Sequence, residues 1–150
     1  MSRRSTKKLP FDVSRYMRPG TALRDAWPRL HQGDCEKFPD TEMVTGLLRA
    51  HPALEPAGSV ARAVDALQNA WRAYHAGAFA EAMQEGAALG HLGGNVANKA
   101  GAIRATYLES EPNRTLTLYQ EVVTRAEALQ TVAPDLPNAW YFHALALGRY

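Results

Sequence analysis

The sequence predicts an all-α fold made of antiparallel helical hairpins. Apolar residues after residue 58 recur at spacings of three and four, which places them on one side of a helix. No segment alternates apolar and polar residues over the length of a strand. The tripeptide Asn-Ala-Trp occurs twice, ending in Trp71 and Trp140, and its two copies are separated by close to two units of about 34 residues. We therefore expect a helical unit that repeats.

Composition and charge restrict the class of protein. The chain has 150 residues, of which 46% are hydrophobic and 21% charged, and this balance indicates one globular domain rather than a disordered or membrane-embedded chain. The net charge of +2 is unevenly distributed, because residues 1–18 contain six arginines and lysines and only one acidic residue, Asp12. We expect residues 1–20 to form a disordered basic arm. The rest of the chain is net acidic and has no basic excess for binding phosphate groups.

Targeting segments are not recognisable in the sequence. No apolar stretch is long enough for a signal peptide or a membrane span, so we expect a cytoplasmic protein. Cys35 is the single cysteine, so it cannot form a disulfide within the chain, and we expect a reduced thiol.

Residues 21–58 are expected to form a capping segment of short helices that packs on the helices after it. Prolines and a glycine interrupt this region at Pro28, Gly33, Pro39, Pro52 and Pro56. The clearest helix follows Asp40, which can accept an N-cap hydrogen bond. Its apolar side consists of Met43, Val44, Leu47 and Leu48.

The first predicted hairpin begins at Ser59. Ser59 can cap a helix that ends at Gly77, and the apolar stripe of this helix is Val60, Val64, Leu67, Trp71 and Tyr74. A second helix runs from Phe79 to Gly90. Within it, Gly86 is expected to let the backbone approach a neighbouring helix closely.

A second hairpin and a further helix complete the predicted region of residues 59–150. Asn95 can cap a helix whose apolar stripe is Val96, Ala100, Ile103 and Tyr107. The tripeptide Glu-Pro-Asn at residues 111–113 interrupts the pattern, and the partner helix then stops before Pro134. A last helix begins near Asn138. The region is thus predicted to contain two hairpins and the first helix of a third.

Two stretches carry a resemblance to a known family. The stretch GAFAEAMQEGAAL, starting at Gly77, resembles the turn and second helix of a tetratricopeptide repeat (TPR). APDLPNAW is similar to the boundary between such repeats, with Pro134 six residues before Trp140. The resemblance covers residues about 60–150 and implies a TPR-like α-solenoid, a right-handed superhelix of hairpins. In it, the two Asn-Ala-Trp tripeptides would mark first helices two units apart.

The resemblance implies a non-catalytic adaptor or scaffold without a cofactor, which binds a peptide or partner helix in the groove of the superhelix. Some members of the family hold a carboxylate with lysine and asparagine, and Asn98, Lys99 and Arg104 have these residue types without the corresponding spacing. The candidate partner-binding residues are Arg72, His75, Asn98, Lys99, Arg104 and Tyr141. The alternatives are a nucleic-acid-associated protein that uses the basic arm and, after it, a small enzyme.

The sequence contains no recognisable arrangement of catalytic residues, which favours a binding function over an enzymatic one. None of the five histidines has a second histidine four residues away, and no carboxylate completes a metal site, so we expect neither catalytic nor metal-binding residues. His75 and His143 are interpreted as packed or groove-lining side chains. Cys35 and His31 have no third residue that would orient a catalytic base. LGHLGGN resembles a phosphate-binding loop only in its glycines, although an anion near Asn95 is physically possible.

The aromatic residues and the last helix give two further expectations. A core position is expected for each of Trp71, Tyr74, Tyr107, Trp140 and Tyr141. The stretch WYFHALALG is uncharged, so we expect an apolar surface that associates with a second copy through Trp140, Leu145 and Leu147. The favoured reason for this surface is that the chain is a fragment of a longer repeat protein, and the alternative is that another chain covers the last helix.

Overall fold

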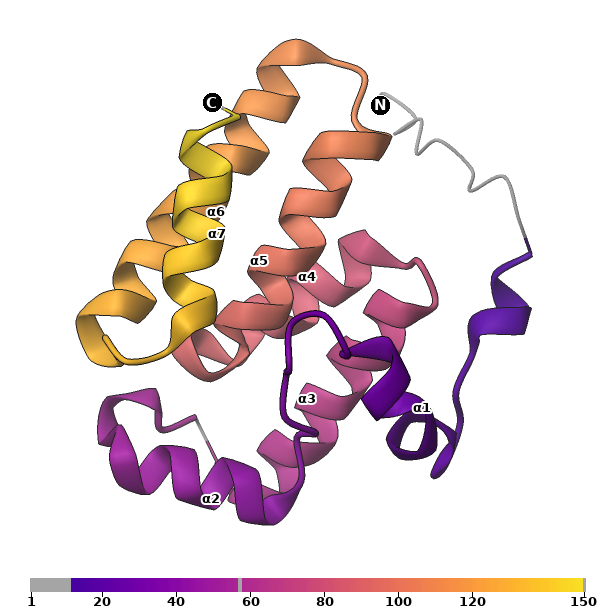
Figure 1. Cartoon of the computed structure of the whole chain (residues 1–150), viewed down its shortest axis with the longest axis vertical. Coiled ribbons are helices and arrows are strands. Elements are labelled where there is room, and N and C mark those ends of the chain that lie inside the picture. Colours follow the sequence, from indigo (N-terminus) through magenta and orange to yellow (C-terminus); the bar gives the residue numbers. More distant parts are fainter. Residues whose placement is uncertain (1–11, 57, 150) are drawn as a thin grey trace.

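The computed structural model describes residues 12–56 and 58–149, and this part of the chain is helical and contains no strand (Figure 1). The long helices are α1 (Ala22–Leu30), α2 (Thr41–Ala50), α3 (Val60–His75), α4 (Phe79–Ala88), α5 (Gly94–Ile103), α6 (Pro112–Val132) and α7 (Pro137–Leu147). Short 3-10 turns are η1 (Val13–Tyr16), η2 (Pro52–Leu54) and η3 (Gly90–Gly93), and α5 continues into the π-helical segment η4 (Arg104–Leu108). The prediction of an all-α fold is confirmed.

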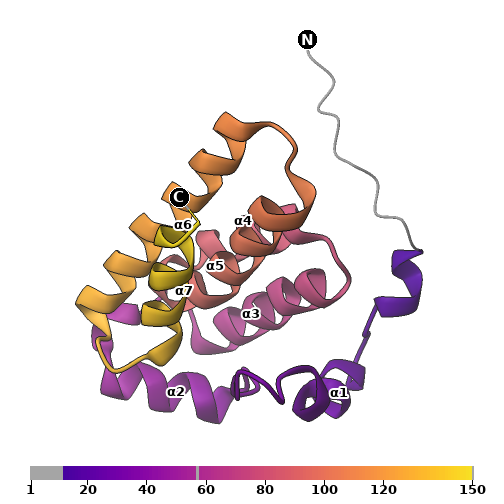
Figure 2. The same ribbon diagram turned by 45° about the horizontal axis from the view of Figure 1, so that its top comes forward.

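The helices from α3 to α7 pack against one another in chain order. Each contacts the next, and α5 also contacts both α3 and α7. In Figure 2, α1 and α2 lie together beneath α3, α5 and α7. The expected basic arm is described only from residue 12 onward, and residues 1–11 lie outside the described part of the chain.

The predicted first hairpin is present with its expected ends. Ser59 Oγ accepts a hydrogen bond of 3.3 Å from the amide of Arg62 at the start of α3. After the helix, Gly77 adopts a positive φ of 82°, which an L side chain disfavours. Gly86 permits a close approach as expected, because a Cβ atom there would lie 2.8 Å from Cγ1 of Val96 and 2.9 Å from the carbonyl oxygen of Gly93.

The second hairpin begins differently from the prediction. Asn95 does not cap α5, because η3 leads directly into that helix and Gly93 occupies the N-cap position. The side chain of Asn95 instead donates a hydrogen bond to Glu36. The predicted break at residues 111–113 is present: Pro112 is in the first turn of α6, and the carboxylate of Glu111 accepts from the amides of Asn113 and Arg114.

The N-terminal helices contribute to the main core. Leu23 and Trp27 of α1 and Val44 of α2 are buried in the same apolar cluster as Trp71 of α3. The ring of Trp27 meets that of Trp71 edge to face, with 5.4 Å between centroids. Helices α1 and α2 therefore share one core with α3.

Three of the five aromatic residues predicted in the core are on the surface. Trp71 is buried and Tyr74 is half-buried, but Tyr107, Trp140 and Tyr141 are 69%, 53% and 59% exposed. Tyr107 lies in the π-helical segment, where the wider turn changes the direction of side chains relative to an α-helical stripe. The indole of Trp140 donates to the carbonyl oxygen of Pro134 at 2.8 Å. The two Asn-Ala-Trp tripeptides therefore place their tryptophans in different environments.

The residues predicted for self-association differ in their exposure. Trp140 and Leu147 are exposed, as a contact surface requires. Leu145 is half-buried and packs against the cluster that contains Phe142 and Ala146, because it lies on the inward side of α7. Leu145 therefore contacts the core of this chain, and the role of all three residues in self-association stays a prediction.

Truncation of the buried tryptophan should have a large effect on stability. We expect Trp71→Ala to lower the free energy of unfolding by about 3–5 kcal/mol, as large aromatic truncations in cores do. Trp140→Ala is the matched control, and its exposed ring predicts a loss below about 1 kcal/mol. Urea denaturation of both variants measures the difference, and equal losses would contradict the burial described above.

Two glycines within helices should respond to alanine with opposite signs. Gly86→Ala forces the backbones of α4 and α5 apart, so we expect a loss of about 1–3 kcal/mol. Gly46→Ala in α2 meets no atom within 4 Å, so we expect a gain of up to about 1 kcal/mol from helix propensity alone. Thermal denaturation that shows Gly86→Ala to be as stable as the parent would exclude the close helix contact.

Candidate functional site: a polar face bound by the chain itself

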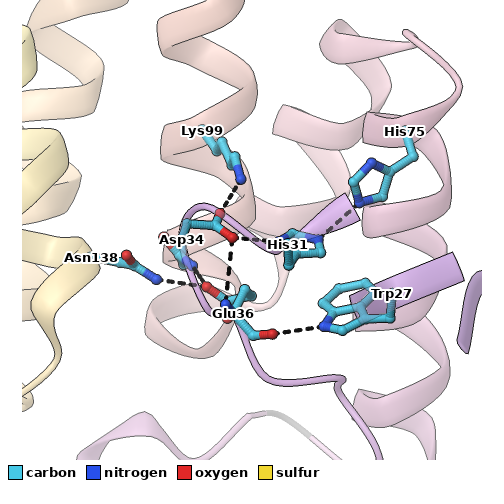
Figure 3. A network of polar contacts seen from close by, with 8 residues as sticks. Trp27, His31, Asp34, Glu36, His75, Lys99 and Asn138 are labelled. Atoms are coloured by element: carbon cyan, nitrogen blue, oxygen red, sulfur yellow. Dashed lines mark hydrogen bonds and ion pairs between the residues drawn. The ribbon is translucent and has the colours of Figure 1, made fainter. Parts of the chain in front are cut away.

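The segment that joins α1 to α2, residues 31–40, crosses the faces of α3, α5 and α7. We call this stretch the connecting segment. Figure 3 shows its side chains meeting side chains from all three helices. The side chains that bind this segment, together with Arg72, which binds the chain just before α1, are here called the inner face. They are Gln68, Arg72 and His75 of α3, Asn95 and Lys99 of α5, and Asn138 of α7.

Asp34 is bound by a lysine on α5. Its Oδ2 atom accepts from Nζ of Lys99, and its Oδ1 atom lies 2.9 Å from Nδ1 of His31. The Lys99 ammonium is also 5.7 Å from the ring centroid of Trp71 and 5.4 Å from that of Tyr74, within range of a cation–π interaction. Burial opposes ionisation of Asp34, but the hydrogen bond and charge of Lys99, with a smaller contribution from His31, lower its pKa. Asp34 is therefore ionised at neutral pH.

Glu36 is bound by amides rather than by a cation. Its Oε2 atom accepts from Nδ2 of Asn138 at 2.6 Å and from Nδ2 of Asn95. Its backbone carbonyl accepts from the indole of Trp27 at 2.7 Å. Burial, with the nearby charge of Asp34, raises the pKa of Glu36 to about 7, and the charge of Lys99 and the two amides only partly oppose this shift. Glu36 therefore titrates near neutral pH.

Two neutral histidines connect the segment to α3. Nε2 of His31 lies 3.0 Å from Nε2 of His75. Burial lowers the pKa of both rings, that of His75 to about 3. A neutral His31 that donates from Nδ1 to Asp34 has a lone pair on Nε2, so His75 is the donor between the two rings. The histidines thus fix the orientation of Asp34 without adding charge.

Backbone carbonyls of the N-terminal region are bound by side chains of α3. Nε of Arg72 donates to the carbonyl oxygen of Arg18 at 3.2 Å, and Nη2 donates to that of Gly20 at 3.3 Å. Nε2 of Gln68 donates to the carbonyl oxygen of Pro39 at 2.9 Å. The inner face therefore binds the N-terminal region in two ways, through its side-chain carboxylates and through its backbone carbonyls.

Three of the predicted partner-binding residues belong to this face. Arg72, His75 and Lys99 all contact the N-terminal region of the same chain. Asn98 is fully buried, and its Oδ1 atom accepts from Nη1 of Arg125 at 2.9 Å. Asn98 is therefore not exposed to a partner in this structure, and its role in partner binding stays a prediction.

The remaining two predicted residues lie outside the inner face. Arg104 is half-buried in η4, beyond the end of α5. Tyr141 is exposed on α7 with its ring against Phe142. Their role in partner binding stays a prediction.

Sequence reasoning missed Asp34, Glu36, Gln68 and Asn138, and it considered Asn95 only as an N-cap and as a possible position for an anion. Their contacts join positions far apart in the chain, such as Glu36 with Asn138. No local spacing marks such a pair. The one available signal was the presence of two acidic residues, separated by Cys35, in a proline-bounded segment without helical periodicity.

The polar side chains of this arrangement are paired with one another by hydrogen bonds and by the ion pair of Lys99 with Asp34. Within residues 12–56 and 58–149, no group of three or more histidine, cysteine, aspartate or glutamate side chains could hold a metal ion. The thiol of Cys35 is exposed, and its residue has a positive φ of 53°. No helix in the described part of the chain has the length and apolar composition needed to cross a bilayer.

The chain matches no family model, no curated protein and no solved structure. Its function must therefore be inferred from its own residues and their geometry.

The titration of Glu36 should make stability depend on pH. A pKa of about 7 in the folded chain exceeds the ordinary value of 4.5, so the folded state retains a proton that the unfolded state loses. The corresponding stability is complete below pH 4.5 and disappears as the pH rises to about 7, a loss of about 3 kcal/mol in total.

Glu36→Gln isolates this contribution, because the histidines and Asp34 remain in both proteins. We expect the stability of the parent relative to Glu36→Gln to fall between pH 5 and pH 8, as measured by urea denaturation at several pH values. A constant difference across this range would mean that Glu36 titrates as an exposed glutamate does.

Proposed function

We propose that the chain is a non-catalytic protein-interaction module that acts in the cytoplasm and binds an extended peptide on its inner face. In this proposal α3 to α7 are arranged as a TPR-like superhelix, with α3 and α4, then α5 and α6, as its hairpins and α7 as the first helix of a third. The single observation that carries the proposal is that the inner face already holds a non-helical stretch of chain, the connecting segment, which begins with a turn at residues 31–34.

The chemistry of the inner face supports a peptide ligand. Lys99, Asn95 and Asn138 present N–H donors to carboxylates, while Arg72 and Gln68 present donors to backbone carbonyls. An extended peptide offers such acceptors at regular intervals, whereas a helix uses its carbonyls internally. We therefore favour an extended peptide over a partner helix.

The alternative of nucleic-acid binding through the basic arm rests on the charge of that arm alone. The two carboxylates held on the inner face, Asp34 and Glu36, occupy its donors with acidic groups of a protein chain. A protein partner is therefore the better-supported class.

The proposal is tested by selection from a random peptide library displayed on phage. The selection uses the parent chain and the variant Asp34→Asn/Glu36→Gln, whose connecting segment has lost its carboxylates. We expect selected peptides to lose affinity about tenfold on Lys99→Ala, since one hydrogen bond to a charged group is removed. Arg62→Ala, an exposed cation elsewhere on α3, should leave their affinity unchanged. Failure to select peptides with either protein, or selection of peptides that are indifferent to Lys99, would sink the proposal.

A further inference from the structure

We propose that the connecting segment is an internal ligand, and that the partner is a peptide with two carboxylates in an Asp-x-Glu arrangement that displaces Asp34 and Glu36 from the inner face. This inference rests on the proposed function and adds the chemistry of the partner and the way in which access to the face is controlled.

The first step is that the two carboxylates occupy two different subsites. Asp34 is received by the ammonium of Lys99, and Glu36 by the amides of Asn95 and Asn138. One subsite is cationic and the other is neutral, so an aspartate and a glutamate are distinguished by the groups that bind them as well as by their length. A ligand with carboxylates at both positions satisfies the same donors without rearrangement of the helices.

The residue between the carboxylates refines this prediction. Cys35 has a φ of 53°, in the left-handed region that glycine adopts without steric cost. Both neighbouring side chains still reach the same face, so this backbone conformation is part of how the segment binds. A partner with glycine at the middle position avoids the cost that Cys35 bears, and Asp-Gly-Glu is therefore the preferred sequence.

The middle of the segment, residues 32–37, can leave while the buried His31 and Pro39 on either side of it stay in place. On one side Trp27 packs against Trp71, and on the other the carboxylate of Asp40 caps α2 by accepting from the amide of Met43. The stretch between these anchors is irregular and includes four exposed residues in succession from Gln32 to Cys35. Its release therefore exposes the subsites while both ends stay tethered.

The inner face binds Glu36 weakly, and this favours its replacement by a carboxylate of the partner. Its carboxylate has no cationic partner at the amide subsite, and burial raises its pKa to about 7. At and above neutral pH the ionised form must be kept in a partly buried site beside Asp34, which opposes docking of the segment. A partner that brings additional contacts elsewhere on the face can therefore compete.

The probe is a synthetic peptide with the sequence of residues 31–40, carrying glycine in place of Cys35 and a fluorescent label. Fluorescence anisotropy measures its binding to the parent chain and to Asp34→Asn/Glu36→Gln. We expect the variant to bind the probe at least about tenfold more tightly, since its own segment has lost the ion pair between Asp34 and Lys99. A control peptide with asparagine and glutamine replacing the acidic residues should lose that affinity, as should Lys99→Ala in the variant background.

Hydrogen exchange of the parent chain provides a second measurement that does not depend on the folding of a variant. Saturating probe should increase amide exchange in residues 32–37 and leave α1 and α2 protected. Absence of probe binding to a folded Asp34→Asn/Glu36→Gln variant, or binding without exposure of residues 32–37, would overturn the inference. If the library instead yields Lys99-dependent peptides without carboxylates, the proposed function stands and this inference fails.

Discussion

The contact between Trp27 and Trp71 determines how the rest of the molecule is arranged. The two rings meet edge to face in the main core, and His31 stacks on Trp27 one helical turn later. This packing fixes α1 against α3, so the chain that leaves α1 must cross the neighbouring helices before α2 begins. The position of the connecting segment on the inner face is thus a consequence of apolar burial, and its polar contacts are added to that constraint.

The polar contacts themselves contribute specificity more than stability. The contacts of Asp34 and Glu36 with side chains of α5 and α7 remove the two carboxylates partly from water. Only Asp34 gains a cationic partner. The ion pair of Asp34 with Lys99 is only partly buried, and such a pair exposed to solvent contributes little to stability. The N–H donors of the inner face, however, can be satisfied only by a ligand whose oxygen atoms lie in the matching positions. The cost of burial is easier to understand if the inner face is selected for recognition.

The sequence was sufficient where the determinants are local. Caps and turns such as Ser59, Gly77 and Glu111 with Pro112 act through neighbouring residues, and the corresponding helix ends were predicted or marked as interruptions. It was insufficient where a side chain has two possible partners. Asn95 has the residue type of an N-cap, but the preceding 3-10 turn makes the helix begin earlier and leaves its amide for Glu36. The exposure of Trp140 likewise depends on the position of α7 against α6, which no local pattern records.

A tethered internal ligand changes what an external partner must provide. A segment held at both ends by short connections competes at an effective concentration in about the millimolar range. The affinity of the partner is reduced by the fraction of molecules in which the face is open. A ligand that fills only the Lys99 subsite or only the amide subsite makes fewer hydrogen bonds than the segment that it must displace. Its binding is therefore weak. Discrimination arises because a successful partner must satisfy both subsites in one extended stretch, and the internal copy sets that threshold.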